Sequence, residues 1–301
     1  MTLYTQISSN LRKTWFLMGF FFIFIIALGW LFSYVYNSEE ILIFAILLSI
    51  FSSFFSYWFS DKIVLGLSRA KEIKKSEAPE LYHLVENLCI TAGLPLPKIY
   101  IIDEAAPNAF ATGRDKNHAV IAVTRGLLEK LEKVELEGVL AHELSHIGNH
   151  DMLLQTIVVI LAGVVVYLSD IFLRISWRGG FRRRDDRGGG YTGLILMLFT
   201  LIALILAPIA ATLIRLAISR KREFLADASG AMLTRYPEGL ARALEKISND
   251  QTPLRVASNA TAHLYIVNPL KSKQVVGWFT KLFSTHPPIE ERIKVLRQMS
   301  V

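Results

Sequence analysis

A pentapeptide near the middle of the chain has the residue types and spacing that bind a metal ion and use it. Residues 142–146 read H-E-L-S-H, which fits the pattern H-E-x-x-H, and the apolar spacing around them predicts a helix from Val134 to Asn149. Residues four apart lie on one face of a helix, so His142 and His146 can bind a single Zn²⁺. Glu143 then projects beside the metal, where a carboxylate can take a proton from an attacking water. Because so short a pattern also arises by chance, the rest of the chain must supply a third ligand and a setting.

A third ligand is needed because a catalytic zinc site takes three protein ligands and leaves one position for water. The spacing H-E-x-x-H-x-x-G-x-x-H, in which a later histidine completes the site, is excluded by Asn149 and Met152 at the two required positions. His150 lies on the same helical face as His146, but it is too far along the axis to share the ion comfortably. We therefore expect His150 to be a helix-end or interface residue.

Two acidic residues on a later charged helix are better candidates. Glu223 lies in the segment R-K-R-E-F-L-A-D at 220–227, and its helix can pack against the motif helix so that a glutamate completes a His₂Glu site. Asp227 follows at i+4 on the same face, from where it could accept an N–H from a ligating histidine. On spacing alone, the alternative is that both are surface acids on a helix of mixed charge.

The apolar segments predict a membrane setting for these residues. The chain has 301 residues, of which 52% are hydrophobic, and its mean hydropathy is +0.38. Four segments have the length and apolar character of transmembrane helices, namely Trp15–Tyr36, Ile41–Phe59, Met152–Leu168 and Tyr191–Leu216. We therefore expect two N-terminal transmembrane helices at 1–60, a first part of a soluble domain at 61–151, two further transmembrane helices at 152–216 joined by an Arg- and Gly-rich loop at 174–190, and a second part of the soluble domain at 217–301.

The distribution of charge predicts which side of the membrane the soluble domain faces. The net charge of +7 is concentrated beside the apolar segments, with basic residues before the first and after the second: Arg12, Lys13, Lys62, Arg69, Lys71, Lys74 and Lys75. The positive-inside rule therefore puts the N-terminus and the chain from Asp61 onward in the cytoplasm. No basic patch interleaved with aromatic residues accompanies this charge, so we expect no nucleic-acid partner.

The loop at 174–190 conflicts with the same rule. If both later segments cross the membrane, Arg182–Arg184 fall on the external side. We expect full crossing, because insertion order often dominates over one later loop. The alternative is a hairpin that does not cross completely.

Around the motif, the soluble segments contain predicted strands and helices. Lys98–Asp103 and His118–Val123 are predicted strands, and the second could be the edge that pairs with a substrate backbone. Pro107–Gly113 fits a strand edge or a tight turn, and Ser68–Lys75 a charged helical lead-in. Further helices are predicted to begin at Pro79 and end at Gly93, and to span Arg125–Leu131 with Thr124 as N-cap, Arg215–Leu233, Pro237–Ile247 and Ile289–Met299. Cys89 is the only cysteine and is expected to be a core residue; no intramolecular disulfide can form, which suits a reducing compartment.

Four motifs occur in an order that resembles a known family. They are N-A-F-A-T-G at 108–113, H-E-L-S-H at 142–146 between transmembrane segments, R-E-F-L-A-D at 222–227 and T-H-P-P at 285–288. Together they resemble the HtpX-type membrane zinc metallopeptidases, whose more distant relatives are the CAAX prenyl endopeptidases. The resemblance covers nearly the whole chain, although the loop at 174–190 is a less typical element.

This resemblance implies a fold and a set of site residues. The implied fold is an α+β membrane protein with four transmembrane helices and a mainly helical, gluzincin-like zinc protease domain that contains a small β-sheet and faces the cytosol. One Zn²⁺ per chain would be bound by His142, His146 and Glu223, with Asp227 hydrogen-bonded to a ligating histidine. His286, held before two prolines, would donate a hydrogen bond to the developing oxyanion; the alternative is a helix-entry residue that fixes the last helix.

An extended substrate is expected to bind through its backbone beside a strand. The residues expected there are Asn108, Ala109, Phe110, His118, Val120 and Ala122, with the His118 side chain itself structural. The predicted function is a zinc-dependent endopeptidase of the cell (inner) membrane, and the resemblance implies misfolded or damaged membrane proteins as substrates. A homo-oligomer is left open.

Two rival functions remain at this point. A catalytically inactive zinc-binding membrane scaffold is disfavoured by Glu143, because binding zinc alone would not require that residue. A transporter or channel would be expected to carry ionisable residues inside the membrane, and the apolar segments have few.

Overall fold

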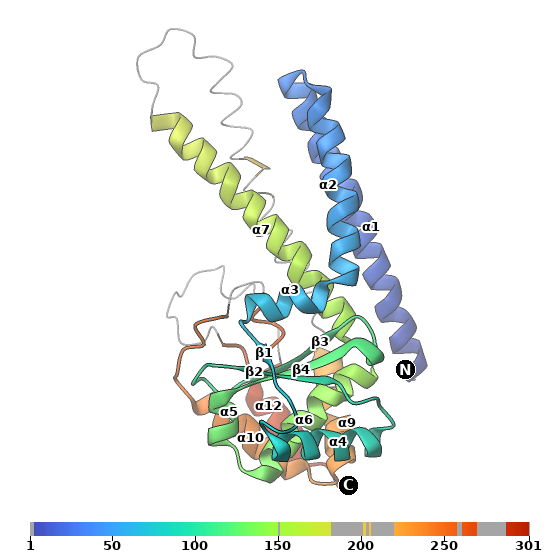
Figure 1. The fold of residues 1–301 in the computed structure, drawn as a ribbon, viewed down its shortest axis with the longest axis vertical. Helices are drawn as coiled ribbons and strands as arrows, with labels where there is room; N and C mark the ends of the chain where they lie inside the picture. Colours follow the sequence, from blue (N-terminus) through green and yellow to red (C-terminus); the bar gives the residue numbers. More distant parts are fainter. Residues whose placement is uncertain are drawn as a thin grey trace.

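The described residues form long apolar helices and a domain of mixed helices and strands (Figure 1). The computed structural model describes residues 3–149, 151–181, 201–202, 205, 220–257, 261–269 and 287–300. The long helices are α1 (Leu3–Tyr36), α2 (Glu39–Trp58) and α7 (Asp151–Phe181). The other elements are α3 (Ser60–Leu67), β1 (Lys71–Glu72), α4 (Pro79–Ala92), β2 (Lys98–Ile102), β3 (Ala109–Gly113), the 3₁₀ helix η1 (Lys116–His118), β4 (Ala119–Thr124), α5 (Arg125–Lys130), α6 (Lys133–Gly148), α9 (Arg220–Thr234), α10 (Pro237–Asn249) and α12 (Ile289–Arg297).

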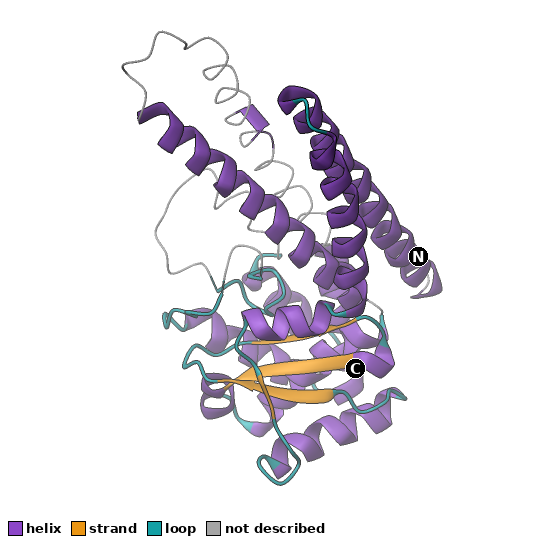
Figure 2. Cartoon of the chain, turned by 45° about the horizontal axis from the view of Figure 1, so that its top comes forward, coloured by secondary structure: helices purple, strands orange, loops and turns teal. Residues whose placement is uncertain are grey.

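Among the described residues, three helices are long and apolar enough to cross a membrane: Ser9–Tyr34, Glu39–Trp58 and Asp151–Asp170. α1 and α2 run side by side as an antiparallel hairpin (Figures 1 and 2), and apolar side chains such as Phe16 on α1 stay as much as 71% exposed. Soluble monomers rarely expose so continuous an apolar surface, so the hairpin is suited to lipid. The predicted fourth segment, Tyr191–Leu216, lies outside the described residues apart from 201–202 and 205.

Four strands form one sheet in the order β1-β2-β4-β3. β2 and β4 are parallel, with Tyr100 opposite Ala122, whereas β3 is antiparallel to β4, with Ala111 opposite Ile121. β4 is therefore an interior strand, and β1 and β3 are the two edge strands. The expectation that the strand at His118–Val123 provides the free edge is wrong, because both sides of its backbone are already paired.

The segment predicted as a charged helical lead-in contains β1 instead. Lys71 and Glu72 pair antiparallel with Ile101 and Tyr100 of β2, and Arg69 just before them has a φ of 51°. A residue in the left-handed region ends a helix. The side of β2 that faces away from β4 offers hydrogen-bond partners to the backbone of this segment. A short charged helix would have only its own backbone as partner, so tertiary contacts override the local charge pattern.

Local signals for helix ends are confirmed at α4 and α5. α4 begins with Pro79 and ends before Gly93, which adopts φ 64° and ψ 33° as a left-handed cap. Thr124 caps α5, because its hydroxyl accepts a hydrogen bond from the backbone N–H of Leu127 at 3.2 Å.

The motif helix α6 runs through the core and matches its predicted range to within one residue at each end. A capping box starts it, in which the backbone N–H of Glu132 donates to the Glu135 carboxylate at 2.9 Å. Val139, Leu140 and Leu144 are fully buried in a core shared with α4, α9, α10, α12 and the sheet. Each such side chain contributes about 1.5–3 kcal/mol through burial, so α6 is held rigidly.

A glycine lets α9 approach α6 closely. A Cβ at Gly230 would lie 3.0 Å from the backbone nitrogen of His142, which is tighter than ordinary contact. The two helices therefore pack almost backbone to backbone at this crossing. This close approach carries Glu223 and Asp227, which lie earlier on α9, to the histidine-bearing face of α6.

Candidate metal centre

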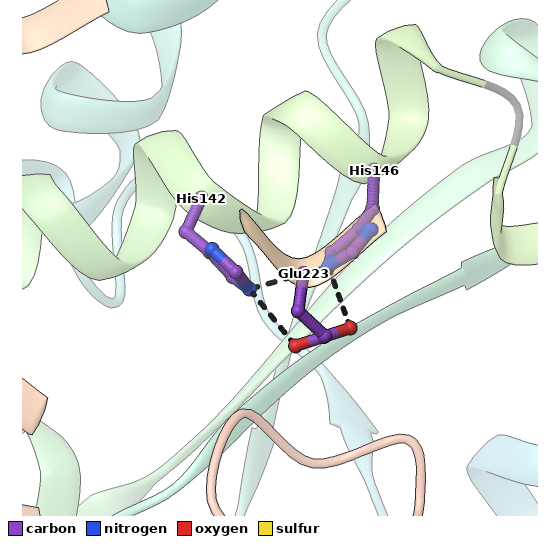
Figure 3. A group of neighbouring side chains, drawn as sticks. All are labelled: His142, His146 and Glu223. Carbon is purple, nitrogen blue, oxygen red and sulfur yellow. Dashed lines mark hydrogen bonds and ion pairs between the residues drawn. The ribbon is translucent and has the colours of Figure 1, made fainter. Parts of the chain in front are cut away.

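Two histidines from α6 and one glutamate from α9 converge on one point (Figure 3). His142 and His146 lie on successive turns, and their Nε2 atoms are 3.2 Å apart. One carboxylate oxygen of Glu223 lies 4.0 Å from Nε2 of His142, and the other lies 3.7 Å from Nε2 of His146. All three side chains are buried, so the cluster forms a desolvated pocket of donor atoms.

The donor set fits a zinc ion. Zinc in proteins takes imidazole nitrogen and carboxylate oxygen, and two bonds of ~2.1 Å at a tetrahedral angle place their donor atoms ~3.4 Å apart. The separations of 3.2, 3.7 and 4.0 Å lie around that value. Magnesium and calcium prefer oxygen-only ligand sets, so two imidazoles disfavour them.

Asp227 supports His142 from the side opposite the convergence point. Its Oδ1 lies 2.9 Å from Nδ1 of His142, although the angles are not those of a well-aligned hydrogen bond. Burial opposes a charge on Asp227, but the adjacent guanidinium of Arg292 outweighs it, and the pKa of Asp227 is lowered. The carboxylate therefore stays ionised and favours the tautomer of His142 that leaves Nε2 for a metal. Burial lowers the pKa of His142 in spite of this neighbour, which favours the neutral ring that binds metals.

His146 has a carboxylate partner of its own. Its Nδ1 lies 3.3 Å from Oδ2 of Asp151, the first residue of α7. Burial alone would lower the pKa of His146, but Asp151 and Glu223 outweigh it and raise the pKa to about 9. Both imidazoles of the motif are thus backed by a buried acid, the arrangement that fixes ring orientation at metal sites.

Glu143 is the acid of the motif that does not join the donor cluster. Burial raises its pKa to about 7, against the opposing effects of His146 and of the backbone N–H of Ala111 on the edge strand β3. A carboxylate with a pKa near neutrality can both accept and return a proton at physiological pH. Glu143 therefore lies between the donor cluster and the edge strand with the acidity of a general base.

The predicted substrate residues at 108–110 lie at the start of the edge strand, where another segment already covers it. The Asn108 amide donates to the carbonyl of Val267 at 2.9 Å, and the carbonyl of Ala109 accepts from Ile266 at 3.0 Å. The Phe110 ring meets that same segment edge-on. Among the described residues, the part of β3 that this segment leaves uncovered is therefore its second half, Ala111–Gly113. Within that half, the backbone N–H of Ala111 lies against Glu143.

The other predicted substrate residues lie away from that edge. Val120 and Ala122 belong to the interior strand β4, whose backbone is paired on both sides. His118 is not in a strand but ends η1, and its exposed ring lies 2.8 Å from Asp115. The prediction that Val120, Ala122 and His118 line a substrate-binding strand edge is therefore corrected. The contact of His118 with Asp115 fits the expected structural role of its side chain. His286 and His150 lie outside the described residues.

Arg292 is one of the residues at the site that sequence reasoning missed. It is fully buried on α12, donates twice to Asp227 and once to the carbonyl of Ile266, and its Nη1 lies 3.7 Å from Glu223. A signal for it exists in the sequence, since Ile289, Arg292 and Leu296 share the apolar stripe of the last helix. An arginine on an apolar stripe indicates a buried acid nearby.

The comparison with known protein families decides where this chain belongs. Residues 75–300 match the family described as peptidase family M48. The chain belongs to that family. The M48 match spans β2, β3 and β4 of the sheet, the motif helix, the donor cluster and Arg292, so the geometry above belongs to a metalloprotease.

Individual relatives extend the match to the whole chain. A protein named Protease HtpX homolog from Dictyoglomus turgidum is 49% identical over 300 residues, covering 99% of this chain and 95% of the relative. One of the same name from Streptococcus gordonii is 43% identical, covering 99% and 100%. The crystal structure of S. mikatae Ste24p shares the fold at 20% identity, with a TM-score of 0.50 over 97% of this chain and 67% of that one. The M48 chain is therefore an HtpX-like membrane metalloprotease.

Proposed function

We propose that this M48 protein is an integral membrane zinc endopeptidase in which His142, His146 and Glu223 hold one Zn²⁺ per chain. The observation that carries the proposal is the convergence of the three donor groups, whose ligand atoms all lie within 4.8 Å of one another. Beside them stands Glu143, a buried carboxylate with a pKa of about 7. A site for metal binding alone would have no need of such a base.

The chain's own residues supply the proton transfers of peptide hydrolysis. When bound, zinc supplies a Lewis acid that polarises the scissile carbonyl and acidifies the attacking water. Glu143 accepts the proton of that water and later returns it to the leaving amine. Asp227 and Asp151 keep the Nδ1 proton on each ligating ring, so that Nε2 faces the metal. From the T-H-P-P motif, His286 is proposed to donate a hydrogen bond to the oxyanion.

The substrate is proposed to be an extended segment of a membrane protein. Ala111–Gly113 on the edge strand β3 would pair with its backbone, beside Glu143, which predicts loose sequence specificity. The charges flanking α1 and α2 favour a cytoplasmic catalytic domain built from 61–151 and 217–301. A site at the foot of α7 suits misfolded or damaged membrane proteins with segments exposed on that side.

The experiment compares the wild type with Glu143→Gln, both as full-length chains in detergent. We expect about one zinc per chain in both proteins, and casein cleavage slower by roughly 10²–10⁴-fold in the variant, as for loss of a general base. His142→Ala serves as the control that loses zinc and cleavage together. Equal cleavage by wild type and Glu143→Gln would reject the endopeptidase and leave a zinc-binding scaffold.

A further inference from the structure

A buried polar cluster connects the first membrane helix to the metal centre. Asn10 on α1, Asp151 at the start of α7 and Arg222 on α9 are each at most 4% exposed. Nδ2 of Asn10 donates to Oδ1 of Asp151 at 2.6 Å, and Oδ1 of Asn10 accepts from Nη1 of Arg222 at 3.1 Å. Nε of Arg222 lies 3.6 Å from the same Asp151 oxygen. These three residues are called the anchor cluster below.

The anchor cluster ends on one of the metal-binding histidines. Asp151 uses Oδ1 for Asn10 and its other oxygen, Oδ2, for Nδ1 of His146 at 3.3 Å. Contacts therefore run without a break from Asn10 through Asp151 to His146. A carboxylate that backs a ligating imidazole sets its tautomer and orientation, and the residue that holds the carboxylate sets both indirectly.

Burying the polar side chains of the anchor cluster costs free energy, which indicates that the cluster has a role that apolar residues could not fill. Asn10 and Asp151 lie in the candidate membrane spans Ser9–Tyr34 and Asp151–Asp170, at the ends nearest the α/β domain (Figure 1). Polar groups in such places are expensive to bury and mark function. α1 and α7 already pack through apolar side chains further along, including Leu17, Phe21 and Ile157. Helix packing alone therefore does not require the cluster.

We propose that Asn10 is a positioning residue of the metal centre, through which the first membrane helix sets how tightly the protein holds its metal. The inference rests on the proposed function, since it takes His146 as a ligand. A carboxamide suits this position because it donates to a carboxylate with one atom and accepts from a guanidinium with the other. Alanine would do neither, and aspartate would face Asp151 with a second carboxylate.

The test measures zinc affinity of full-length protein in detergent by competition with a chelator. For Asn10→Ala we expect affinity weaker by about 10-fold, the lower end of the range for residues that support metal ligands. Thr14→Val is the matched control, because Thr14 is buried one turn further along α1. Among the described residues, its hydroxyl donates only to the backbone carbonyl of Asn10. We expect its zinc affinity to stay within about twofold of wild type.

An exchange of the side chains of Asn10 and Asp151 gives a second, independent test. Asn10→Asp places two carboxylates in contact and should weaken zinc binding more than Asn10→Ala does. In the double variant Asn10→Asp with Asp151→Asn, a carboxylate and a carboxamide face each other again, and the new amide oxygen can accept from His146. We expect the double variant to bind zinc about tenfold more tightly than Asn10→Asp alone, which is coupling of the kind that neighbouring residues show. A merely structural role would change thermal stability across the four proteins and leave zinc affinity constant.

The outcomes separate this inference from the proposed function. A folded Asn10→Ala protein with wild-type zinc affinity would overturn the positioning role. If Asn10→Ala does not fold, the exchange decides, and a double variant no better than Asn10→Asp would overturn it. His146→Ala is measured in parallel, and retention of stoichiometric zinc in that variant would instead reject the proposed metal site.

Discussion

Asp227 accepts two hydrogen bonds from the guanidinium of Arg292, 2.8 and 2.7 Å long, with neither side chain reached by solvent. The same carboxylate lies 2.9 Å from the ring of His142, and the same guanidinium lies 3.7 Å from Glu223. Arg292 therefore neutralises the acids that the candidate metal centre gathers around its histidines. Through it, the last helix of the chain becomes part of the site.

Replacement of Arg292 by methionine should destabilise the protein strongly. Asp227 would remain buried without its cation, and breaking a buried ion pair in this way costs about 3–5 kcal/mol. Arg297→Met on the same helix is the control, because Arg297 is 44% exposed and pairs with Glu238 at the surface, where a pair contributes about 0–1 kcal/mol. Chemical denaturation in detergent measures both. Similar losses for the two variants would contradict the role given to Arg292.

The substitution Glu223→Gln should remove zinc while leaving the fold in place. Glutamine keeps the size and a carbonyl oxygen, but it lacks the charge of a zinc-binding carboxylate. Support residues around a metal typically change affinity by 10–100-fold, so loss of a ligand should exceed about 100-fold. The measurement is zinc content after dialysis against a weak chelator, with the exposed Glu290→Gln as control. Full retention of zinc by Glu223→Gln would assign the third ligand elsewhere.

Zinc affinity should rise with pH through the neutral range. In the metal-free protein the pKa of His146 is raised to about 9, so below that pH the ring is protonated and zinc must displace the proton. For one displaced proton the affinity gains about tenfold per pH unit and levels off above about pH 9. Titration calorimetry in buffers of different ionisation enthalpy counts the released protons. Asp151→Asn should show a shallower dependence, and an affinity independent of pH in the wild type would exclude a protonated His146.

Addition of one methyl group at Gly230 should displace α9 from α6 and so disturb the metal centre. The new Cβ would lie 3.0 Å from the backbone nitrogen of His142, so α9 must move away from α6 and carry Glu223 with it. Overpacking of this kind costs about 1–3 kcal/mol. Gly163→Ala on α7 is the control, since a Cβ there meets nothing within 4 Å. The unfolding temperature and the zinc affinity should both fall for Gly230→Ala and stay unchanged for Gly163→Ala. Equal values for the two variants would show that α6 and α9 can accommodate the extra methyl group.

Local patterns in the sequence were sufficient for much of the fold. The range of the motif helix, the caps at Gly93 and Thr124, and the three apolar helices are confirmed because caps and apolar periodicity act over a few residues. Strand pairing is decided by distant neighbours instead. That is why β1 was predicted as a helical lead-in and why β4 rather than β3 was taken for the edge.

In the candidate site too, features set by nearby residues could be predicted and those set by distant residues could not. His142, Glu143 and His146 are adjacent enough to form a motif, and Glu223 followed from the character of its helix together with family resemblance. Arg292 and Asn10 could not be linked to the site in this way, because Arg292 contacts Asp227 across 65 residues of sequence and Asn10 contacts Asp151 across 141. Such pairs follow from packing, which a single sequence does not reveal.

The placement of the third donor has a consequence for how the enzyme is made. Roughly 80 residues, including α7, separate His146 from Glu223, and ribosomes add about 5–20 residues per second. A nascent chain thus carries its two histidines for several seconds before Glu223 is synthesised, and Arg292 follows later still. We expect the half-made polypeptide to be harmless to other proteins crowded at the site of membrane insertion. We therefore expect the order of synthesis to delay activity until Glu223 has been made.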